Sequence, residues 1–321
     1  MIGNGLDVLD VDLLAFEQGD ERARRATVDG VRRSLATGFV YTSHDVSEGF
    51  LDEAYGQLEE FFAAPAGAKA EFVVPHSHGQ TGYTGLLVET AATAEHADWK
   101  EMLNWGRPLP AGHPLAARFP HRYLPPVLPE PLVPGITETL GVFHDRIQDL
   151  QRRFLRIVAV CIGCDETFFD TMLANGTTLT RAIHYPAMQL APGAEHVWAA
   201  EHGDINLITA LPRATARGLQ VKLGDGSWID AVPPAGKAVI NTGMMLELLT
   251  NGAIPTGIHR VVADPDQPGD RYSVVQFCHP SPWTILSPVP SCVTVDRPLR
   301  YPAIAAADRL DEVLWQINLL S

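Results

Sequence analysis

The sequence has no hydrophobic run long enough to cross a membrane, and it carries few positive charges. Its longest apolar stretches, such as residues 155–163, are far shorter than the roughly 20 residues that a membrane-spanning helix needs. The 24 Lys and Arg residues against 38 Asp and Glu residues give a formal net charge of −14. Because no Lys/Arg-rich segment offsets this acidity, a surface that binds phosphates is excluded. We expect neither a membrane nor a nucleic-acid partner.

Cysteines are also scarce, with four in 321 residues, which is too few for a disulfide scaffold. Cys161 and Cys164 form a CxxC pair, but no second CxxC or nearby histidine pair completes a tetrahedral zinc set. We interpret these two residues as buried thiols at the end of an apolar helix. The N-terminus is acidic and lacks the basic start and apolar core of a secretion signal, so we expect a cytoplasmic location.

The residue pattern changes near Thr177. Before it, apolar periodicity and capping residues predict strands at 6–14 and 39–44, and helices at 21–38, from Ser47 onward and at 142–163, with loops and short strands over 75–135. After it, seven short β-rich runs alternate with turns rich in Gly, Pro and Asp. This spacing predicts an antiparallel sandwich or a double-sheet barrel, with the helical half packed on it.

The stretch AAEHGDINLIT, residues 199–209, raises the question of a metal site. In an extended strand His202 and Asp204 point the same way, and Gly203 lets the backbone approach closely. His259 is the best candidate for a third ligand. Two imidazoles and one carboxylate are the ligand set of non-haem Fe(II) oxygenases. The pair alone favours a polar turn, since twelve histidines make some later His almost certain.

A second feature is the segment DRYSVVQF at 270–277, in which Arg271 and Ser273 share one strand face. A guanidinium pairs with a carboxylate through two parallel hydrogen bonds, and a neighbouring hydroxyl can donate to the same anion. If the pair faces inward, it needs an anion to compensate the buried charge. The alternative is a surface Arg at the start of a strand.

Together these residues match a known pattern. HGD at 202–204, His259 and RYS at 271–273 resemble the HxD…H…RxS pattern of the isopenicillin N synthase-like group of Fe(II)/2-oxoglutarate oxygenases. Further resemblance to the group lies, in order, in the segments 34–69, 79–85, 98–106, 180–186 and 239–261. The resemblance therefore extends from about residue 6 to 290.

The resemblance implies a mainly β protein with flanking helices, built on a double-stranded β-helix, or jelly-roll. We expect an N-terminal helical and mixed module at 1–140, the oxygenase core at 141–290, and a C-terminal segment at 291–321. The helix predicted at 307–320 could form a lid or simply pack on the core.

The resemblance also implies the cofactors Fe(II), 2-oxoglutarate and O2. The residues that would bind Fe(II) and carry catalysis are His202, Asp204 and His259. Those that would bind 2-oxoglutarate are Arg271, Ser273 and Tyr185. Two departures from the group, Ile183 in place of a frequent Asn and Met244 in place of an Asp, remove none of these residues.

The substrate contacts are predicted from strand parity and from nearness to the HGD segment. Arg181 would face the pocket, where it could bind a substrate carboxylate, or lie in solvent. Ile205 and Phe277 would line the cavity or pack in the core. Trp198, just before the HGD segment, could belong to a lid.

We therefore expect an enzyme that hydroxylates, desaturates or cyclises a small molecule, in specialised metabolism such as antibiotic biosynthesis. One alternative is an iron oxidase of the isopenicillin N synthase type, which uses no 2-oxoglutarate. The other is a catalytically silent jelly-roll binding protein. The substrate and the oligomeric state are not predicted.

Overall fold

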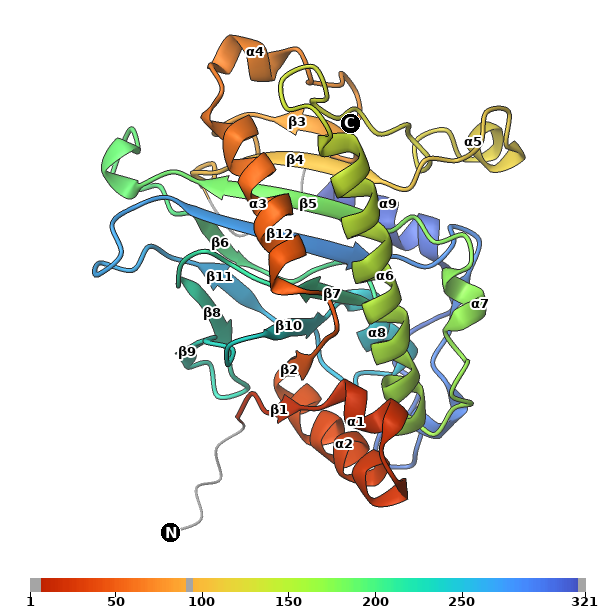
Figure 1. The fold of residues 1–321 in the computed structure, drawn as a ribbon. Coiled ribbons are helices and arrows are strands. Elements are labelled where there is room, and N and C mark those ends of the chain that lie inside the picture. Colours follow the sequence, from red (N-terminus) through yellow and green to blue (C-terminus); the bar gives the residue numbers. More distant parts are fainter. Residues whose placement is uncertain (1–6, 91–94, 317–321) are drawn as a thin grey trace.

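Two antiparallel sheets form the centre of the computed structural model, which describes residues 7–90 and 95–316 (Figure 1). The larger sheet has the strand order β1 (Asp10–Val11), β2 (Phe39–Ser43), β10 (Lys237–Thr242), β7 (Ile208–Leu211), β12 (Arg271–Cys278), β5 (Leu179–Tyr185), β4 (Glu101–Gly106) and β3 (Gly82–Thr84). The smaller sheet has the order β6 (Ala199–His202), β11 (His259–Val261), β8 (Leu219–Lys222) and β9 (Trp228–Asp230). A separate pair joins β13 (Ile285–Leu286) to β14 (Ile304–Ala305).

The β-rich second half confirms the expected sandwich of short strands. Each predicted run after residue 177 contains a strand of one of the two large sheets. The first half contributes β1 to β4 to the larger sheet, where only the β1–β2 pair is parallel. The fold is thus mainly β with helices, as predicted.

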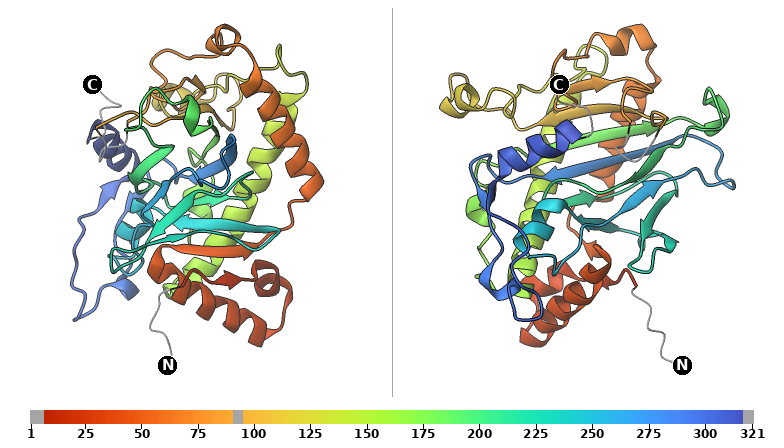
Figure 2. Two further views of the ribbon diagram at one scale, coloured as in Figure 1. Left: turned by 90° about the vertical axis from the view of Figure 1, so that its left-hand side faces the viewer. Right: turned by 180° about the vertical axis from the view of Figure 1, so that it is seen from behind.

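Nine α-helices surround the sheets within the described residues. They are α1 (Leu13–Gln18), α2 (Glu21–Ser34), α3 (Glu48–Ala63), α4 (Ala66–Ala70), α5 (Pro114–Arg118), α6 (Ile136–Cys161), α7 (Asp170–Leu173), α8 (Met244–Leu249) and α9 (Ala306–Gln316). α3 and α6 cover the outer face of the larger sheet, whereas α9 lies on the opposite side (Figures 1 and 2). No helix among the described residues is long and apolar enough to span a membrane.

α6 fixes this helical layer to the sheet because it buries a full apolar stripe and one polar side chain. Phe143, Ile147 and Phe154 lie in the core, as expected for an amphipathic helix. The buried Gln151 amide donates to the Gln276 carbonyl of β12 at 2.7 Å. This hydrogen bond ties the middle of α6 to the central strand of the sheet.

Two element boundaries differ from the prediction for local reasons. Of the strand predicted at 6–14, only Asp10–Val11 is a strand within the described residues, because the Asp12 carboxylate accepts from Ala15 N at 3.1 Å and starts α1. The long helix begins at Ile136 rather than 142. The Glu130 carboxylate binds the first free amides of α6, Gly135 N at 2.7 Å and Thr137 N at 3.0 Å. A cap supplied from outside the helix leaves no periodic pattern.

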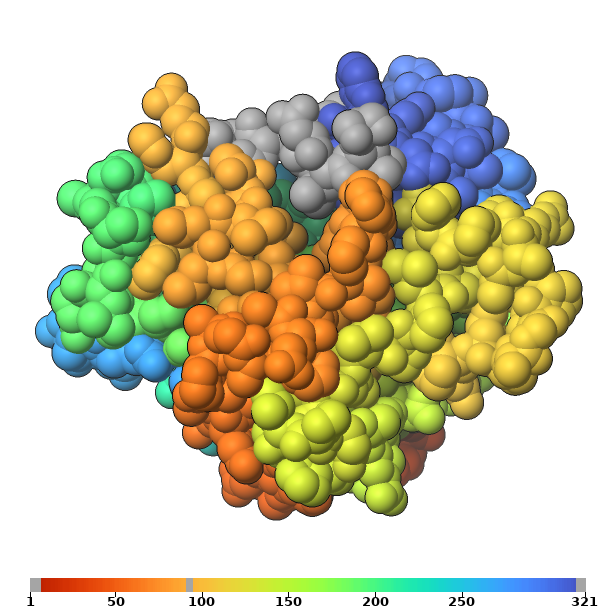
Figure 3. All heavy atoms as spheres, turned by 90° about the horizontal axis from the view of Figure 1, so that it is seen from above, coloured from red at the N-terminus to blue at the C-terminus, as the bar shows by residue number. Residues whose placement is uncertain are grey.

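Seen from above, segments distant in sequence meet on one face of the molecule (Figure 3). The orange segment near residue 70, the yellow segment near residue 115 and the blue C-terminal part lie around this face. The end of the larger sheet that carries β3 and β4 lies beneath them (Figure 1).

We predict that Gly38→Ala lowers the free energy of unfolding by more than about 2 kcal/mol. Gly38 ends the 3-10 helix Leu35–Thr37, which follows α2, with φ of 79°, and an added Cβ would lie 2.5 Å from Gly257 Cα. Gly56→Ala is the control. Gly56 lies in α3 with nothing near its added Cβ, so the change should add roughly 0.5–1 kcal/mol. Urea denaturation measures the free energy of unfolding of both variants. An unchanged value for Gly38→Ala would contradict the crowding of this turn.

Candidate functional site

A cavity of about 390 Å³ is lined by His202 and Asp204, two of the three residues that the sequence singled out as a metal site. Its apolar wall includes Leu179, Ile205, Ile258, Phe277 and, from α9, Leu310, Val313 and Leu314. Its polar wall includes Gln80, Glu89, Asp98, Lys100, Arg181, His202, Asp204 and His279. The cavity is therefore an apolar hollow with a few polar groups, the usual form of a small-molecule site.

The structure brings His202, Asp204 and His259 together. One ligand atom from each lies within 4.8 Å of the others, and no other group of three such residues in the described chain does so. The reason is the sheet register, since His202 on β6 pairs directly with His259 on β11. The two imidazole rings lie 4.3 Å apart, centroid to centroid.

Each imidazole is oriented by a backbone carbonyl. His202 Nδ1 lies 2.7 Å from Ala200 O, and His259 Nδ1 lies 3.1 Å from Gly257 O. If each Nδ1 carries the proton, each Nε2 offers a free lone pair, which is the form that binds metals. Burial and the neighbouring His259 lower the pKa of His202 to about 4, so its ring is neutral at pH 7.

The carboxylate of Asp204 is buried and held by two side chains. Thr209 Oγ1 donates to Asp204 Oδ2 at 2.5 Å, and Asn241 Nδ2 donates to the same oxygen at 2.7 Å. Burial alone would raise the pKa of Asp204, but the two histidines and these hydrogen bonds outweigh it and lower the pKa. Asp204 is thus an anion with one oxygen fixed by the protein.

The strand does not deliver both residues of the HGD segment, contrary to the sequence interpretation. β6 ends at His202, and Gly203 and Asp204 follow in a non-strand segment. Gly203 is needed there because an added Cβ would lie 2.7 Å from Thr256 Cγ2 and 3.0 Å from Ile258 Cδ1. The close approach that Gly203 permits is to the chain leading into β11.

Arg271 is buried without an acidic partner. Its side chain is 2% exposed, and no carboxylate among the described residues forms an ion pair with it. Arg271 Nη1 lies 3.1 Å from Ser273 Oγ, and Nε donates to Ala216 O at 3.2 Å. Burial lowers the pKa of Arg271. The predicted inward Arg–Ser pair is present, and its charge is uncompensated.

Tyr185 and Trp198 lie between the two sheets. Tyr185 is the cross-strand partner of Arg271, and the guanidinium carbon lies 5.0 Å from the centre of its ring. Trp198 is 1% exposed and donates to Pro186 O at 2.8 Å. It packs beside Tyr185 and does not line the cavity, so its assignment to a lid or a substrate contact is wrong.

Arg181 lines the cavity, and each of its three nitrogens donates one hydrogen bond to the protein. Its Nε donates to Asn104 Oδ1 at 2.7 Å, Nη1 to Glu89 Oε1 at 3.2 Å and Nη2 to Gly79 O at 3.3 Å. Its guanidinium carbon also lies 5.4 Å from the Phe277 ring centre. Glu89 is the carboxylate that pairs with Arg181, and the expected binding of a substrate carboxylate by Arg181 stays a prediction.

Sequence reasoning missed the charged group opposite the triad. Lys100 Nζ lies 2.8 Å from Asp98 Oδ2 and 3.1 Å from Glu89 Oε2. Burial alone would raise the pKa of Glu89, but Arg181 and Lys100 outweigh it and lower the pKa to about 2. The available signal was the DWKE segment, in which Asp98 and Lys100 alternate and so share one face of an extended chain.

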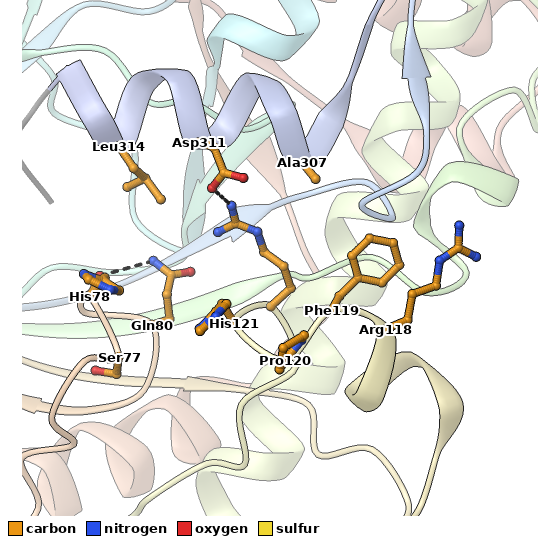
Figure 4. Close-up of a pocket in the computed structure, with 11 residues that line it drawn as sticks. Ser77, His78, Gln80, Arg118, Phe119, Pro120, His121, Ala307, Asp311 and Leu314 are labelled. Atoms are coloured by element: carbon orange, nitrogen blue, oxygen red, sulfur yellow. Dashed lines mark hydrogen bonds and ion pairs between the residues drawn. The ribbon is translucent and has the colours of Figure 1, made fainter. Parts of the chain in front are cut away.

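A second cavity of about 220 Å³ adjoins the first between α9 and the loops near His78 and Phe119 (Figure 4). An ion pair between Arg122 and Asp311 of α9 lies beside it. The two cavities share His78, Gln80 and Leu314. The helix predicted near the C-terminus thus forms a wall of both cavities; its action as a lid stays a prediction.

Comparison with known proteins agrees with this geometry. Residues 6–130 match the family described as non-haem dioxygenase in morphine synthesis, N-terminal, and residues 177–280 match the 2OG-Fe(II) oxygenase superfamily. A solved 2OG-Fe(II) oxygenase family protein from Caulobacter crescentus is 31% identical with a TM-score of 0.85, over 98% of this chain and 100% of that one. The chain belongs to the 2OG-Fe(II) oxygenase family.

The descriptions of two further relatives name a bound ligand or a product. A full-length protein of Neurospora crassa, solved in complex with alpha-KG and thymine, is 26% identical with a TM-score of 0.85, over 100% of this chain and 99% of that one. Kihadalactone A synthase of Citrus sinensis is 27% identical, over 95% of this chain and 92% of its own.

The 2OG oxygenase is therefore a non-haem Fe(II)- and 2-oxoglutarate-dependent dioxygenase with a jelly-roll core, acting on a small molecule, as predicted. Its cofactors are Fe(II), 2-oxoglutarate and O2. The donor set, two imidazoles and one buried carboxylate, fits a ferrous ion. The buried Arg271 fits a carboxylate anion.

We predict that the free energy of unfolding falls at acid pH as the ion pairs of Glu89 are lost. Because the folded pKa of Glu89 is depressed to about 2, its stabilisation is complete above the ordinary value of 4.5 and is lost as the pH falls towards 2. Between pH 5 and 3, the unfolding free energy of the unmodified protein should fall by roughly 2 kcal/mol more than that of Glu89→Gln. Urea denaturation at each pH measures this. Glu53→Gln, at an exposed position of α3, is the control and should follow the unmodified protein.

Proposed function

We propose that His202, Asp204 and His259 bind the catalytic Fe(II), and that Arg271, Ser273 and Tyr185 bind the distal carboxylate of 2-oxoglutarate. The observation that carries the proposal is the uncompensated Arg271 guanidinium, buried between the same two sheets that bring the triad together. Burying a cation without an anionic partner is costly, and a bound anion would offset that cost. The dicarboxylate supplies one.

The residues of the chain have three tasks in the reaction. The triad would hold the ion through two imidazoles and one carboxylate. Thr209 and Asn241 fix Asp204, so that the anionic ligand keeps its orientation. The apolar wall from Ile205, Phe277 and α9 keeps water from the reacting atoms. Fe(II), when bound, supplies oxidative decarboxylation of 2-oxoglutarate by O2 and the oxidation of the substrate.

We further propose that the substrate carries no net charge. The acidic residues of the cavity wall outside the triad each have a basic partner, in the pairs Glu89–Arg181, Glu89–Lys100, Asp98–Lys100 and Glu201–Lys222. The segments outside the described residues, 1–6, 91–94 and 317–321, contain no charged side chain. A charged substrate would therefore enter the cavity without a counter-charge, which is costly. Thymine, bound by the Neurospora crassa neighbour, is an uncharged example.

The reaction type is hydroxylation or a related oxidation such as desaturation or ring formation. Relatives with names such as mugineic-acid 3-dioxygenase of Hordeum vulgare support a place in specialised metabolism. Antibiotic biosynthesis and a cytoplasmic location remain predictions from the sequence. An iron oxidase without 2-oxoglutarate is the rival that the following experiment addresses.

Anaerobic addition of Fe(II) and 2-oxoglutarate should produce the weak visible charge-transfer band of a chelated keto acid. We expect Asp204→Ala and His259→Ala to abolish the band, because each removes one of three protein ligands. His113→Ala, which changes a histidine outside the cavity, should leave it intact. Iron binding without a band would refute the 2-oxoglutarate site, and iron binding unaffected by the triad variants would refute the ligand assignment.

The charge of the substrate can be tested with sets of compounds that share a carbon skeleton and differ as carboxylate, primary amide and amine. Succinate release should be stimulated by amides and other neutral members. Glu89→Gln leaves Arg181 and Lys100 with less negative charge to balance them. The ratio of succinate release with the carboxylate to that with the amide should therefore rise at least ten-fold. A preference of the unmodified enzyme for the carboxylate or amine would contradict the neutral-substrate proposal.

A further inference from the structure

His184 lies on β5 beside Tyr185 and points to the opposite face of the larger sheet, since alternate side chains of a strand face opposite ways. Its ring stacks on Tyr272, with centroids 4.5 Å apart and planes 6° apart. Nδ1 lies 2.7 Å from Glu101 Oε1, and Nε2 lies 3.1 Å from Asp270 Oδ2. The side chain is only 9% exposed. One buried imidazole thus spans two carboxylates.

His184, Glu101 and Tyr272 lie side by side on three neighbouring strands of the larger sheet. Glu101 of β4 is the cross-strand partner of His184, and Tyr272 of β12 is its partner on the other side. The next pair along β5 and β12 is Tyr185 with Arg271. Asp270 directly precedes Arg271 in the chain. The bridge therefore lies on the reverse side of the residues that face the 2-oxoglutarate anion.

The charges around the ring fix the bridge firmly. Glu101 also accepts from Lys69 Nζ at 2.7 Å and from the Tyr83 hydroxyl. Asp270 Oδ1 accepts from Ala187 N at 2.8 Å. Both carboxylates are therefore held by other groups of the protein as well as by the ring.

We propose that His184 is a positioning residue for 2-oxoglutarate, which holds Arg271 and Tyr185 in register from the far side of the sheet. The inference rests on the proposed function. Arg271 has no ion pair with a described residue to hold it, and its polar contacts are to neutral groups such as Ser273 Oγ and Ala216 O. The backbone on either side of it must therefore be fixed by its neighbours, and Asp270 and Tyr272 are both fixed by His184. A displacement of about 1 Å of a positioning group can lower the rate of an enzyme reaction on the order of 100-fold.

The test compares 2-oxoglutarate binding and Fe(II) binding in variants of the whole enzyme. His184→Phe keeps a ring to stack on Tyr272 and loses the contacts of both ring nitrogens with carboxylates. We expect its dissociation constant for 2-oxoglutarate, from anaerobic titration of the Fe(II) form, to rise about 10- to 100-fold. Its Fe(II) affinity in the absence of 2-oxoglutarate should stay within about two-fold, since the triad lies on β6, on β11 and in the segment that follows β6. His184→Gln, which keeps a donor, should restore part of the affinity.

Two further variants separate positioning from general loss of packing. Asp270→Asn changes a residue that is 40% exposed, so it folds even if His184→Phe does not, and it should weaken 2-oxoglutarate binding about three- to ten-fold. His144→Gln is the matched control, because His144 is equally buried and contacts Thr180 at the other end of β5, 2.7 Å away. It should leave 2-oxoglutarate binding unchanged.

Unaltered 2-oxoglutarate binding in Asp270→Asn and in folded His184→Phe would overturn the inference. A loss of Fe(II) affinity as large as the loss of 2-oxoglutarate affinity would also overturn it. So would a loss of 2-oxoglutarate affinity in His144→Gln as large as that in His184→Phe. If the unmodified enzyme binds Fe(II) and no 2-oxoglutarate, the proposed function itself fails, and the inference fails with it.

Discussion

The uncompensated charge of Arg271 is the constraint on which the site depends. A guanidinium that is 2% exposed and has no ion pair with a described residue costs several kcal/mol, by the general behaviour of buried ions. The fold bears this cost on the two-sheet framework that also brings the triad together. The cost becomes useful when a carboxylate enters, because binding that anion then relieves the unfavourable burial of the cation.

The two-sheet architecture explains how the separate parts meet. The smaller sheet places His202 against His259 by strand register, and the larger sheet places Arg271 against Tyr185 in the same way. Both pairs arise from residues more than 50 positions apart. Backbone ladders therefore set the geometry of both halves, and side chains such as Thr209 refine it.

The sequence was sufficient to predict the fold class and to nominate the residues of the site. The HxD and RxS spacings, joined to a resemblance along the chain, identified the triad and the Arg–Ser pair. Other features could not be predicted, since they depend on contacts between distant segments. The partner of Arg181 is Glu89, 92 positions away, and the cap of α6 comes from Glu130 outside the helix. The expectation for Trp198 rests on proximity in sequence, which does not report that its ring packs between the sheets.

The central claim is that the buried Arg271 binds a carboxylate of 2-oxoglutarate. Its most direct test is to compare the thermal unfolding of the unmodified protein and of Arg271→Met, both in the Fe(II) form under nitrogen, with and without 2-oxoglutarate. The account predicts that Arg271→Met is at least as stable as the unmodified protein without 2-oxoglutarate, because a costly buried charge is removed. It also predicts that only the unmodified protein gains stability on adding 2-oxoglutarate. An Arg271→Met protein that 2-oxoglutarate stabilises as much as the unmodified one would contradict the account.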